Sequence, residues 1–587
     1  MAFMKLLLIL FGLFAVLPSY SQLSIQSNDQ AEHFLYVRDR ELFVQKELRL
    51  AQTNTSSLQA ALYLRKDAQL LQGEKKDNEN IGNGNISVFQ TGTSNAYQYN
   101  YWGMPVRILP NLQFLFNDFV AEPLDKITSR KVTLISQLDG KSIPLSISSK
   151  WLYKFSGKTY SSWEFLGNDF NLKSGEGFSM KGVNGNNFSE IEGQPINPGS
   201  AQIYNFLGMP NDGEIDLDIE KDQVILVGNP YPSALDLNKF LLENTATTGI
   251  AYFWDSSKSL NSHYLKDYEG GYGMYSPGAN LYLPPAFIRF SDYSFTGETG
   301  KFVARRFAPI AQGFMVIGKN TGKIIFKNSQ RVYQKPDALL SQFKAPSENI
   351  PSLILNIETD STYIRQLGLA FRSDSSIEED HAMDAEMFDE KPNEIAWSIS
   401  GENYAINVRP LLDQELIPLN IYLKEAAELQ FSISELRNFN PDRIFIYDSR
   451  EGLYYSIKTG YYKMRLDAGE YLDRFYLSFL EKSPVEPEPL ISPASEKLNK
   501  PKNVLLNSLE IFQNNLEEQL EIKMLYEANL QMLRLYTING RLVSLKEFRG
   551  QEKEFQLATG NLSTGVYIVK VNTSDAKEIT KKIEIRN

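Results

Sequence analysis

The densest group of metal-ligand side chains lies at residues 212–218, which read Asp-Gly-Glu-Ile-Asp-Leu-Asp. Because side chains alternate along a β-strand, Glu214, Asp216 and Asp218 would share one face of a strand here. Neighbouring carboxylates repel one another unless water or a cation lies between them, and Ca²⁺ takes several oxygen ligands. The spacing is not that of an EF-hand loop. The segment is compatible with a calcium site at these three residues, but a solvated acidic face explains it with fewer assumptions.

Histidine and cysteine limit the catalytic chemistry that this chain can perform. The three histidines are His33, His263 and His381, and the chain has no cysteine. A serine hydrolase needs a histidine beside its nucleophile, and no Gly-x-Ser-x-Gly elbow is present. The lack of cysteine excludes disulfides, thiolate zinc sites and cysteine nucleophiles. His381 lies among acidic residues and is expected to be a solvated loop residue. No catalytic residue and no cofactor other than calcium is predicted.

Tryptophan could stack on sugars if it were exposed in a groove. The chain has five tryptophans, each in an apolar, strand-like context: Trp102, Trp151, Trp163, Trp254 and Trp397. That context favours packing in the core. Carboxylate pairs for glycoside hydrolysis can be found in any chain with 71 acidic residues, so their presence decides nothing.

The elements that would position these residues are mostly short β-strands, so the chain is predicted to be all-β and multidomain. Residues 22–335 form a strand-rich region that begins as a meander, with strands near 34–37, 42–44, 61–64 and 86–89. One short helix is expected at 235–244. Residues of about 99–210 and 211–335 resemble two diverged copies, because in each a Gly-x-Pro element precedes a Gly-Phe strand. These elements are 103–105 with 177–178, and 228–230 with 313–314.

The second half of the chain predicts two further domains and a linker. Residues 346–482 carry strands at intervals typical of a β-sandwich. Residues 483–502 contain closely spaced prolines and predict an extended, protease-accessible linker. Residues 503–587 predict a small C-terminal sandwich, in which Leu520, Ile522 and Met524 alternate with polar residues.

Composition and the N-terminus indicate export. An apolar run follows Lys5 and ends near small residues before Gln22, which predicts a secretory signal peptide at 1–21. No later stretch has the roughly 20 apolar residues that a transmembrane helix needs. The formal net charge of -11 and the lack of Lys/Arg clusters argue against nucleic acid as a partner.

The C-terminal residues carry the most specific pattern in the chain. Asn539 and Gly540 separate two apolar runs and predict a type I′ hairpin. The strand at 565–571 begins Gly565-Val566-Tyr567, and Lys581-Lys582 lies close to the end.

This combination resembles the type A C-terminal sorting domain of the type IX (Por) secretion system, an Ig-like β-sandwich. One departure is that residues 513–515 read Gln-Asn-Asn, where the family has Pro-Asn-Pro. The second predicted copy, through segments such as 228–233 and 252–255, also resembles uncharacterised large cargo proteins of that system.

The resemblance implies a destination and a set of partners. It implies passage through the periplasm and across the outer membrane by the type IX machinery, and removal of the sorting domain. The mature protein would be released or attached to surface lipopolysaccharide.

For the passenger, we expect an adhesin-like binding or scaffold protein with a glycan or protein ligand. The alternative is a secreted polysaccharide-acting enzyme with an unrecognised site. A purely structural spacer is the third possibility.

Overall fold

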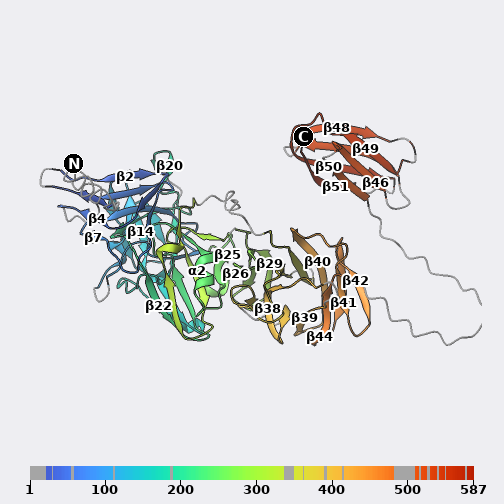
Figure 1. Ribbon diagram of the computed structural model, residues 1–587, viewed down its shortest axis with the longest axis horizontal. Helices are drawn as coiled ribbons and strands as arrows, with labels where there is room; N and C mark the ends of the chain where they lie inside the picture. Colours follow the sequence, from blue (N-terminus) through green and yellow to red (C-terminus); the bar gives the residue numbers. More distant parts are fainter. Residues whose placement is uncertain are drawn as a thin grey trace, which may run out of the picture. The chain divides into compact units, whose positions relative to one another are not determined.

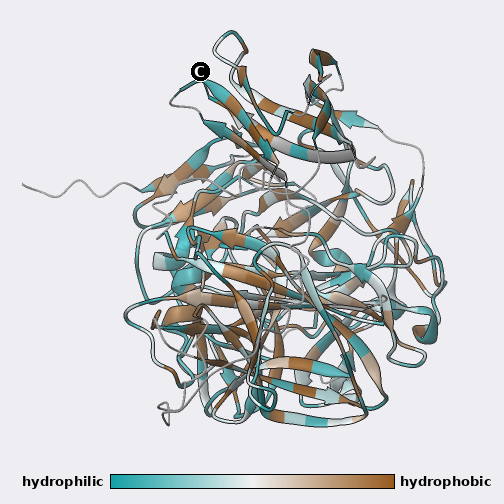
Figure 2. Cartoon of the chain, turned by 90° about the vertical axis from the view of Figure 1, so that its right-hand side faces the viewer, coloured by the Kyte–Doolittle hydropathy of each residue, from teal (hydrophilic) through white to brown (hydrophobic). Residues whose placement is uncertain are grey.

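The computed structural model describes most of the chain in two compact units, one within residues 1–484 and one within 485–587. The described residues are 22–28, 31–53, 59–109, 113–185, 189–303, 305–335, 349–360, 363–388, 393–412, 416–480, 509–514, 517–524, 529–537, 541–548, 550, 552–574 and 578–586. β-Strands dominate both units (Figure 1), which confirms the predicted all-β class. Hydrophobic residues concentrate along the strands (Figure 2). The predicted signal peptide and the Pro-rich linker lie outside the described residues.

The first unit begins with strands that coil as a parallel solenoid. Each strand pairs in parallel with a strand of the next turn: β1 with β4 and β7, β2 with β5 and β8, and β3 with β6. Leucines and other apolar residues fill the interior. The bounds are β1 (Leu23–Gln26), β2 (Leu35–Arg38), β3 (Glu41–Val44), β4 (Leu48–Ala51), β5 (Leu62–Arg65), β6 (Gln69–Gln72), β7 (Ile81–Gly82) and β8 (Ile86–Thr91).

This solenoid corrects the predicted meander. The strand positions are close to those expected, but a meander would pair neighbouring strands antiparallel. After β2 and after β5 the chain instead turns a corner, at Asp39 (φ 57°) and Lys66 (φ 57°). A single left-handed residue sends the next strand into a different sheet, so each strand pairs with its equivalent one turn later.

The centre of the first unit is one large sheet. Its main order is β29-β28-β26-β25-β31-β23-β15-β17-β9, with β16 beside β15 and β27 beside β26. The bounds are β9 (Tyr99–Trp102), β15 (Tyr153–Gly157), β16 (Trp163–Phe165), β17 (Phe178–Lys181), β23 (Val224–Gly228), β25 (Ala251–Ser256), β26 (Glu269–Ser276), β27 (Leu281–Leu283), β28 (Ala286–Arg289), β29 (Phe295–Thr299) and β31 (Gly313–Ile317).

The remaining strands and single turns of this part of the chain extend the solenoid sheet, as the strands within 120–131 and 203–208 do, or form smaller sheets. They comprise η1 (Phe116–Asp118), β10 (Val120–Pro123), β11 (Ser129–Lys131), β12 (Thr133–Ile135), β13 (Gly140–Ser142), β14 (Leu145–Ser148), η2 (Ser149–Trp151), η3 (Tyr160–Ser162), β18 (Val183–Asn184), β19 (Glu190–Ile191), β20 (Gln194–Pro195), β21 (Ile203–Gly208), β22 (Ile215–Ile219), β24 (Ala234–Asp236), η4 (Leu265–Asp267), β30 (Phe307–Ala308), β32 (Gly322–Phe326), η5 (Asn328–Gln330) and β33 (Arg331–Val332).

The predicted helix is present as α2 (Leu237–Glu243), the one α-helix among the described residues. It begins after Asp236, whose carboxylate accepts hydrogen bonds from the backbone N–H groups of Asn238 (3.1 Å) and Lys239 (3.4 Å). Such an N-cap satisfies donors that the first helical turn leaves free. Leu237, Phe240 and Leu241 are buried against the sheet.

The two segments predicted to be copies pair their strands in the same register. In the first, β9 pairs antiparallel with β17 and Trp102 faces Phe178. In the second, β23 pairs antiparallel with β31 and Val227 faces Phe314. Trp102 and Val227 each directly precede the glycine of a Gly-x-Pro element, so the matched pairs fall at matched positions in the sequence.

The contacts between the two segments are also reciprocal. The N–H of Gly103 donates to the carbonyl of Ala311 (2.7 Å), and the N–H of Gly228 donates to that of Gly175 (2.9 Å). Ala311 (φ 61°) and Gly175 (φ 91°) share a left-handed conformation. A Cβ atom added to Gly228 would lie 2.2 Å from the Cα of Gly103. This approach of two backbones therefore requires glycine on both sides.

Residues 349–480 form a curled sheet with its own core. Its order is β42-β41-β44-β39-β37-β38-β35-β34-β40-β43, with β36 beside β38. The terminal strands meet where the rings of Tyr455 and Tyr462 stack at 3.9 Å, so the sheet nearly closes into a barrel. The bounds are β34 (Ser352–Thr359), β35 (Tyr363–Phe371), β36 (Ala385–Glu386), β37 (Glu394–Ile399), β38 (Glu402–Arg409), β39 (Ile417–Leu423), β40 (Ala427–Arg437), β41 (Phe445–Asp448), β42 (Leu453–Ser456), β43 (Tyr461–Leu466) and β44 (Gly469–Ser478).

An apolar interface joins this barrel-like sheet to the large central sheet. Leu281 and Leu283 of β27 belong to the same buried cluster as Ala370, Ile406 and other residues of the barrel-like sheet. Burial of apolar surface at such a junction stabilises the contact between the two parts. Within the first unit, β25 and β26 lie between the solenoid strands and the strands β39 to β44 (Figure 1).

The second unit is a small antiparallel sandwich. One sheet has the order β45-β46-β49 and the other β48-β47-β50-β51. Leu520, Ile522 and Met524 are buried in its core, as their alternation predicts. The bounds are β45 (Leu509–Asn514), β46 (Gln519–Met524), β47 (Leu530–Thr537), β48 (Leu542–Glu547), β49 (Glu554–Ala558), β50 (Gly565–Thr573) and β51 (Glu578–Ile585).

Candidate ligand-binding site

The candidate site is an aromatic cavity of about 460 Å³ on the large central sheet. Small-molecule sites in proteins span roughly 300–1,000 Å³, so the volume suits a ligand. Aromatic rings make up most of the wall. The lining residues are Tyr99, Tyr101, Trp151, Tyr153, Tyr160, Ser161, Trp163, Ser179, Trp254, His263, Leu265, Tyr268, Tyr272 and Phe290.

The strand register places these rings together. Tyr99 and Tyr101 alternate with Trp102 along β9, so the two tyrosines face the cavity and Trp102 faces the core. In the neighbouring strand β17, Ser179 lies opposite Tyr101 and also opposite Tyr153 of β15. Side chains of directly paired residues lie side by side on one face of a sheet. The cavity floor is therefore fixed by ordinary β-pairing.

Ring contacts connect the two sides of the wall. The hydroxyls of Tyr101 and Tyr272 lie 2.7 Å apart and share a hydrogen bond. The ring of Trp163 lies 5.9 Å from that of Tyr101, and Trp254 lies 5.3 Å from Tyr272 in an edge-on arrangement. Such aromatic pairs contribute about 0.5–1.5 kcal/mol each beyond their burial. The wall is consequently preorganised, which lowers the entropic cost of binding.

A buried lysine lies behind the wall. The side-chain nitrogen of Lys181 is 3.7 Å from the centre of the Trp151 ring and 3.0 Å from Nδ1 of His263. Nε2 of His263 is 2.6 Å from a carboxylate oxygen of Asp139. Both ring nitrogens of His263 therefore have a hydrogen-bonding partner, Lys181 at Nδ1 and Asp139 at Nε2. The imidazole also stacks on Trp151, with ring centres 5.2 Å apart.

Burial shifts the ionisation of this group and of the tyrosines. Desolvation lowers the pKa of Lys181 to about 7, and the negative charge of Asp139 partly opposes that shift. Burial raises the pKa values of Tyr99, Tyr101 and Tyr268 above their usual range. The tyrosine hydroxyls of the wall are thus protonated and can act as hydrogen-bond donors or acceptors.

The arrangement is suited to binding rather than to acid–base chemistry. Glycoside hydrolysis needs two carboxyl groups on either side of the scissile bond. None of the residues that line the cavity carries a carboxylate, and His263 has both ring nitrogens engaged by Lys181 and Asp139. Lys181 is 2 % exposed and is not part of the lining, so its amine reaches Trp151 and His263 rather than the cavity.

The five tryptophans divide between the cavity and the core. Trp102 and Trp397 are buried, as expected from their apolar contexts, and the indole N–H of Trp397 donates to the carbonyl of Gly368 (2.8 Å). Trp151, Trp163 and Trp254 line the cavity and are half-buried, so for them the expectation of core packing is wrong. An apolar strand context does not distinguish a core from the wall of an aromatic pocket.

Sequence reasoning also missed Lys181, Asp139 and the role of His263. These three residues are far apart in the chain and lie together because β17, a loop after β25 and a loop before β13 meet at one edge of the cavity. Their local sequences give no sign of this. The alternation of aromatic residues at 99 and 101, and at 151 and 153, was the one available signal.

The acidic segment at 212–218 is divided between the surface and the interior. Asp216 and Asp218 project from β22, and Lys323 of the paired strand β32 forms ion pairs with both. Glu214 is exposed just before β22, whereas Asp212 is buried beside Lys75 (3.0 Å). Within the described ranges, no group of three or more His, Asp or Glu side chains is placed to hold a metal ion. The calcium site stays a prediction.

The residues of the predicted sorting motif lie on β50 and β51. Gly565 begins β50, Val566 follows it, and the Tyr567 hydroxyl donates to the carbonyl of Ser563 (2.9 Å). The ammonium of Lys581 donates to the carbonyl of Ile511 (2.7 Å) and so links the two sheets. Asn539, Gly540 and the side chain of Lys582 lie outside the described residues, although β47 and β48 pair as the two strands of the predicted hairpin.

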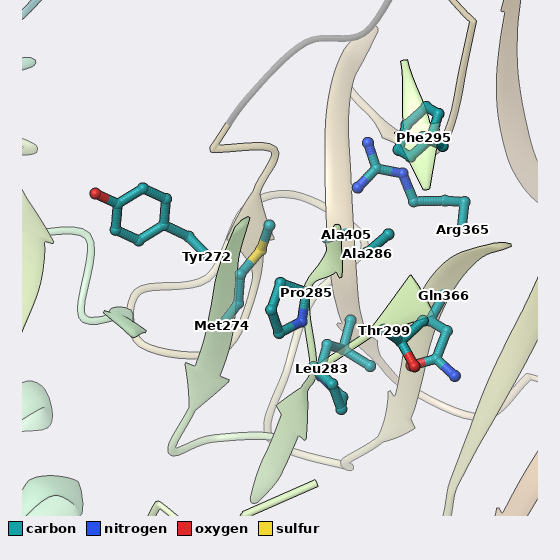
Figure 3. Close-up of a pocket in the computed structure, with 11 residues that line it drawn as sticks. Tyr272, Met274, Leu283, Pro285, Ala286, Phe295, Thr299, Arg365, Gln366 and Ala405 are labelled. Atoms are coloured by element: carbon teal, nitrogen blue, oxygen red, sulfur yellow. The ribbon is translucent and has the colours of Figure 1, made fainter. Parts of the chain in front are cut away.

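A second cavity, at the junction with the barrel-like sheet, is too small for a ligand. It lies between β26 to β29 and β35 (Figure 3) and has a volume of about 20 Å³. This is room for roughly one water molecule. Arg365 at its edge forms a two-pronged ion pair with Glu394. In Figure 3 the Tyr272 ring lies at the opposite edge of the group from Arg365.

Comparisons with known proteins assign a family to each unit. A family described as a domain of unknown function (DUF8693) matches residues 16–479. A family described as a secretion system C-terminal sorting domain matches residues 510–586. No curated protein matches the chain. The described residues include no helix of the length and apolarity needed to cross a membrane.

Proposed function

The chain belongs to the DUF8693 family and ends in a secretion-system sorting domain, and from this premise we propose that the passenger is an adhesin-like ligand-binding protein. The sorting domain directs export by the type IX system, across the outer membrane to the cell surface or the medium. The type IX secretion machinery is therefore a partner of residues 510–586.

The aromatic cavity is the observation that supports binding as the function. A preformed concave site with apolar rings and a few polar groups is the usual form of a small-ligand site. Tyrosine and tryptophan are also the residue types that dominate recognition surfaces, because they provide large contact area at a low cost in side-chain entropy.

A secreted polysaccharide-acting enzyme is the second candidate function. It would use the same cavity, and the His263–Asp139 pair is the acid–base group nearest to it. The cavity lining favours the binding function, because glycoside hydrolysis needs two carboxyl groups and none of the lining residues carries one. An assay for release of reducing ends from soluble polysaccharides separates the two functions.

The terminal unit supports three finer proposals about processing. Its two packed antiparallel sheets support an Ig-like sandwich as the fold of the sorting domain. We place the cleavage that removes it in the Pro-rich linker 483–502. Attachment of the passenger to surface lipopolysaccharide, or its release, follows that cleavage.

The matched strand registers support an origin of the cavity region by internal duplication. We propose that residues of about 99–210 and 211–335 are diverged copies. Both copies contribute to the cavity: Tyr101 and Trp163 come from the first, Trp254 and Tyr272 from the second. The binding site would then have formed where the copies meet.

Two experiments test the proposed function. Deletion of residues 503–587 should leave the protein in the periplasm, as measured by immunoblotting of cell fractions; normal surface levels would contradict the role of the sorting domain.

For the passenger, a thermal-shift screen of extracellular small molecules against the full chain should find a ligand whose effect Trp163→Ala abolishes. Tyr461→Ala is the matched control, since Tyr461 is 62 % exposed on β43. Hits that the Trp163→Ala variant still binds equally well would place binding elsewhere.

A further inference from the structure

We propose that the aromatic cavity binds uncharged sugar units of an extracellular glycan. The proposal rests on the binding function proposed above and narrows its ligand to one chemical class. It is carried by the charge, the polar groups and the exposure of the cavity wall.

The lack of charged side chains in the cavity wall argues against ionic ligands. The lining residues include no Asp, Glu, Lys or Arg. A charged group that leaves water for this wall would find no counter-charge, and an uncompensated buried charge is strongly unfavourable. Acidic sugars and anionic headgroups are therefore poor ligands.

A cationic ligand is disfavoured because the side-chain nitrogen of Lys181 already lies over these rings. Aromatic cages recognise quaternary ammonium groups through free ring faces. The side-chain nitrogen of Lys181 lies 3.7 Å from the centre of the Trp151 ring, 5.0 Å from that of Tyr99 and 5.1 Å from that of Tyr268. A cation in the cavity would compete with this amine for the same ring electrons.

A purely apolar ligand is disfavoured by the polar atoms of the wall. The hydroxyls of Ser161 and Tyr160 border the space. A hydrocarbon that displaced water from these hydroxyls would leave them without hydrogen bonds, at a cost of about 1–3 kcal/mol each. A ligand with hydroxyl groups could pair with each of these.

A neutral pyranose has the two kinds of surface that the wall requires. Its ring C–H groups form an apolar face that can lie on tryptophan or tyrosine, and its hydroxyls project from the ring edge toward hydrogen-bond partners. Tyr160, which lines the cavity, is 64 % exposed, so the mouth opens to solvent. A sugar unit within a longer glycan can thus enter without being cut from its chain.

The test compares three classes of probe on the full chain by tryptophan fluorescence and calorimetry. The probes are neutral oligosaccharides (β-1,4-glucan, β-1,4-xylan, α-mannan and chitin hexamers), acidic oligosaccharides (polygalacturonate and alginate hexamers) and choline. We expect binding of at least one neutral oligosaccharide, little changed between low and high salt. Trp163→Ala should weaken it about tenfold, the loss of one good stacking contact. Trp254→Ala, which removes a second ring of the lining, should also weaken it, and Tyr461→Ala should not.

The outcomes separate this proposal from the binding function on which it rests. Cavity-dependent binding of choline or of acidic oligosaccharides, without binding of any neutral one, would overturn the glycan proposal and leave the binding function intact. Neutral oligosaccharides that bind Trp163→Ala and Trp254→Ala as tightly as the unmodified chain would also overturn the glycan site. If no probe of the three classes binds and the thermal-shift screen finds no ligand, both the glycan proposal and the binding function are overturned.

Discussion

Replacement of Lys181 by methionine should remove a pH dependence from the stability of the passenger. In the folded chain this lysine is 2 % exposed and burial lowers its pKa from 10.5 to about 7. In the unfolded chain the side chain is in water and recovers the ordinary value. Between pH 7 and 10.5 the unfolded state thus binds more protons than the folded state, and stability rises with pH across that window.

The magnitude follows from the two pKa values. A folded-state value of about 7 makes the free energy of unfolding about 2 kcal/mol larger at pH 9 than at pH 7. Lys181→Met keeps the length of the side chain but cannot be charged, so this contribution disappears. Lys150→Met is the matched control, because Lys150 is exposed on the neighbouring turn η2.

The assay is urea unfolding followed by tryptophan fluorescence, at pH 7 and at pH 9. All five tryptophans lie before residue 398, so the signal reports the passenger and not the sorting domain. The quantity compared is the change in unfolding free energy between the two pH values, for the unmodified chain and for each variant. An equal change in the unmodified chain and in Lys181→Met would refute the reasoning about this lysine.

The remaining predictions concern a backbone contact, an ion pair and a metal. Gly228→Ala should destabilise the passenger by about 1–3 kcal/mol in the same assay, because its Cβ would overlap Gly103; an unchanged stability would contradict the close approach. Glu394→Gln should cost about 3–5 kcal/mol in urea unfolding, because it replaces the carboxylate paired with the buried Arg365 by a neutral amide, and an unchanged stability would contradict the role of this pair. The calcium hypothesis predicts a heat of Ca²⁺ binding by calorimetry that Asp216→Ala abolishes; unchanged heats would end it.

The sorting domain was predictable because its signals are local. Alternation along the strand at 520–524 places Leu520, Ile522 and Met524 on one face, and the structure buries all three. The register of such a strand is fixed by which face is apolar. The one helix, expected at 235–244, is found at Leu237–Glu243, within two residues at either end.

The solenoid was missed because pairing between distant strands leaves only a faint repeat in the sequence. Residues 35–38 read Leu-Tyr-Val-Arg and residues 62–65 read Leu-Tyr-Leu-Arg, and these segments pair in parallel. Short strands in a row are compatible with either a meander or a solenoid. The left-handed corners at Asp39 and Lys66 decide between them, and neither residue type by itself predicts that conformation.

The cavity could not be predicted from the sequence because burial is a property of the assembled sheet. Trp102 on β9 and Trp163 on β16 are both strand tryptophans, yet one packs on Tyr204 in the core and the other lines the cavity. The register of β9 with β17 determines which face meets solvent. The contact of Lys181 with His263 depends on a loop whose course no local pattern indicates.

The near closure of the barrel-like sheet bears on the resistance of the protein to aggregation during export. An open sheet exposes a row of unpaired backbone groups at each edge, which can recruit strands of other chains and lead to aggregation. In residues 349–480 the rings of Tyr455 and Tyr462 stack across the two terminal strands, β42 and β43, and so narrow the access of another strand to these edges. Such shielding would reduce edge-to-edge association of the cargo before it is translocated.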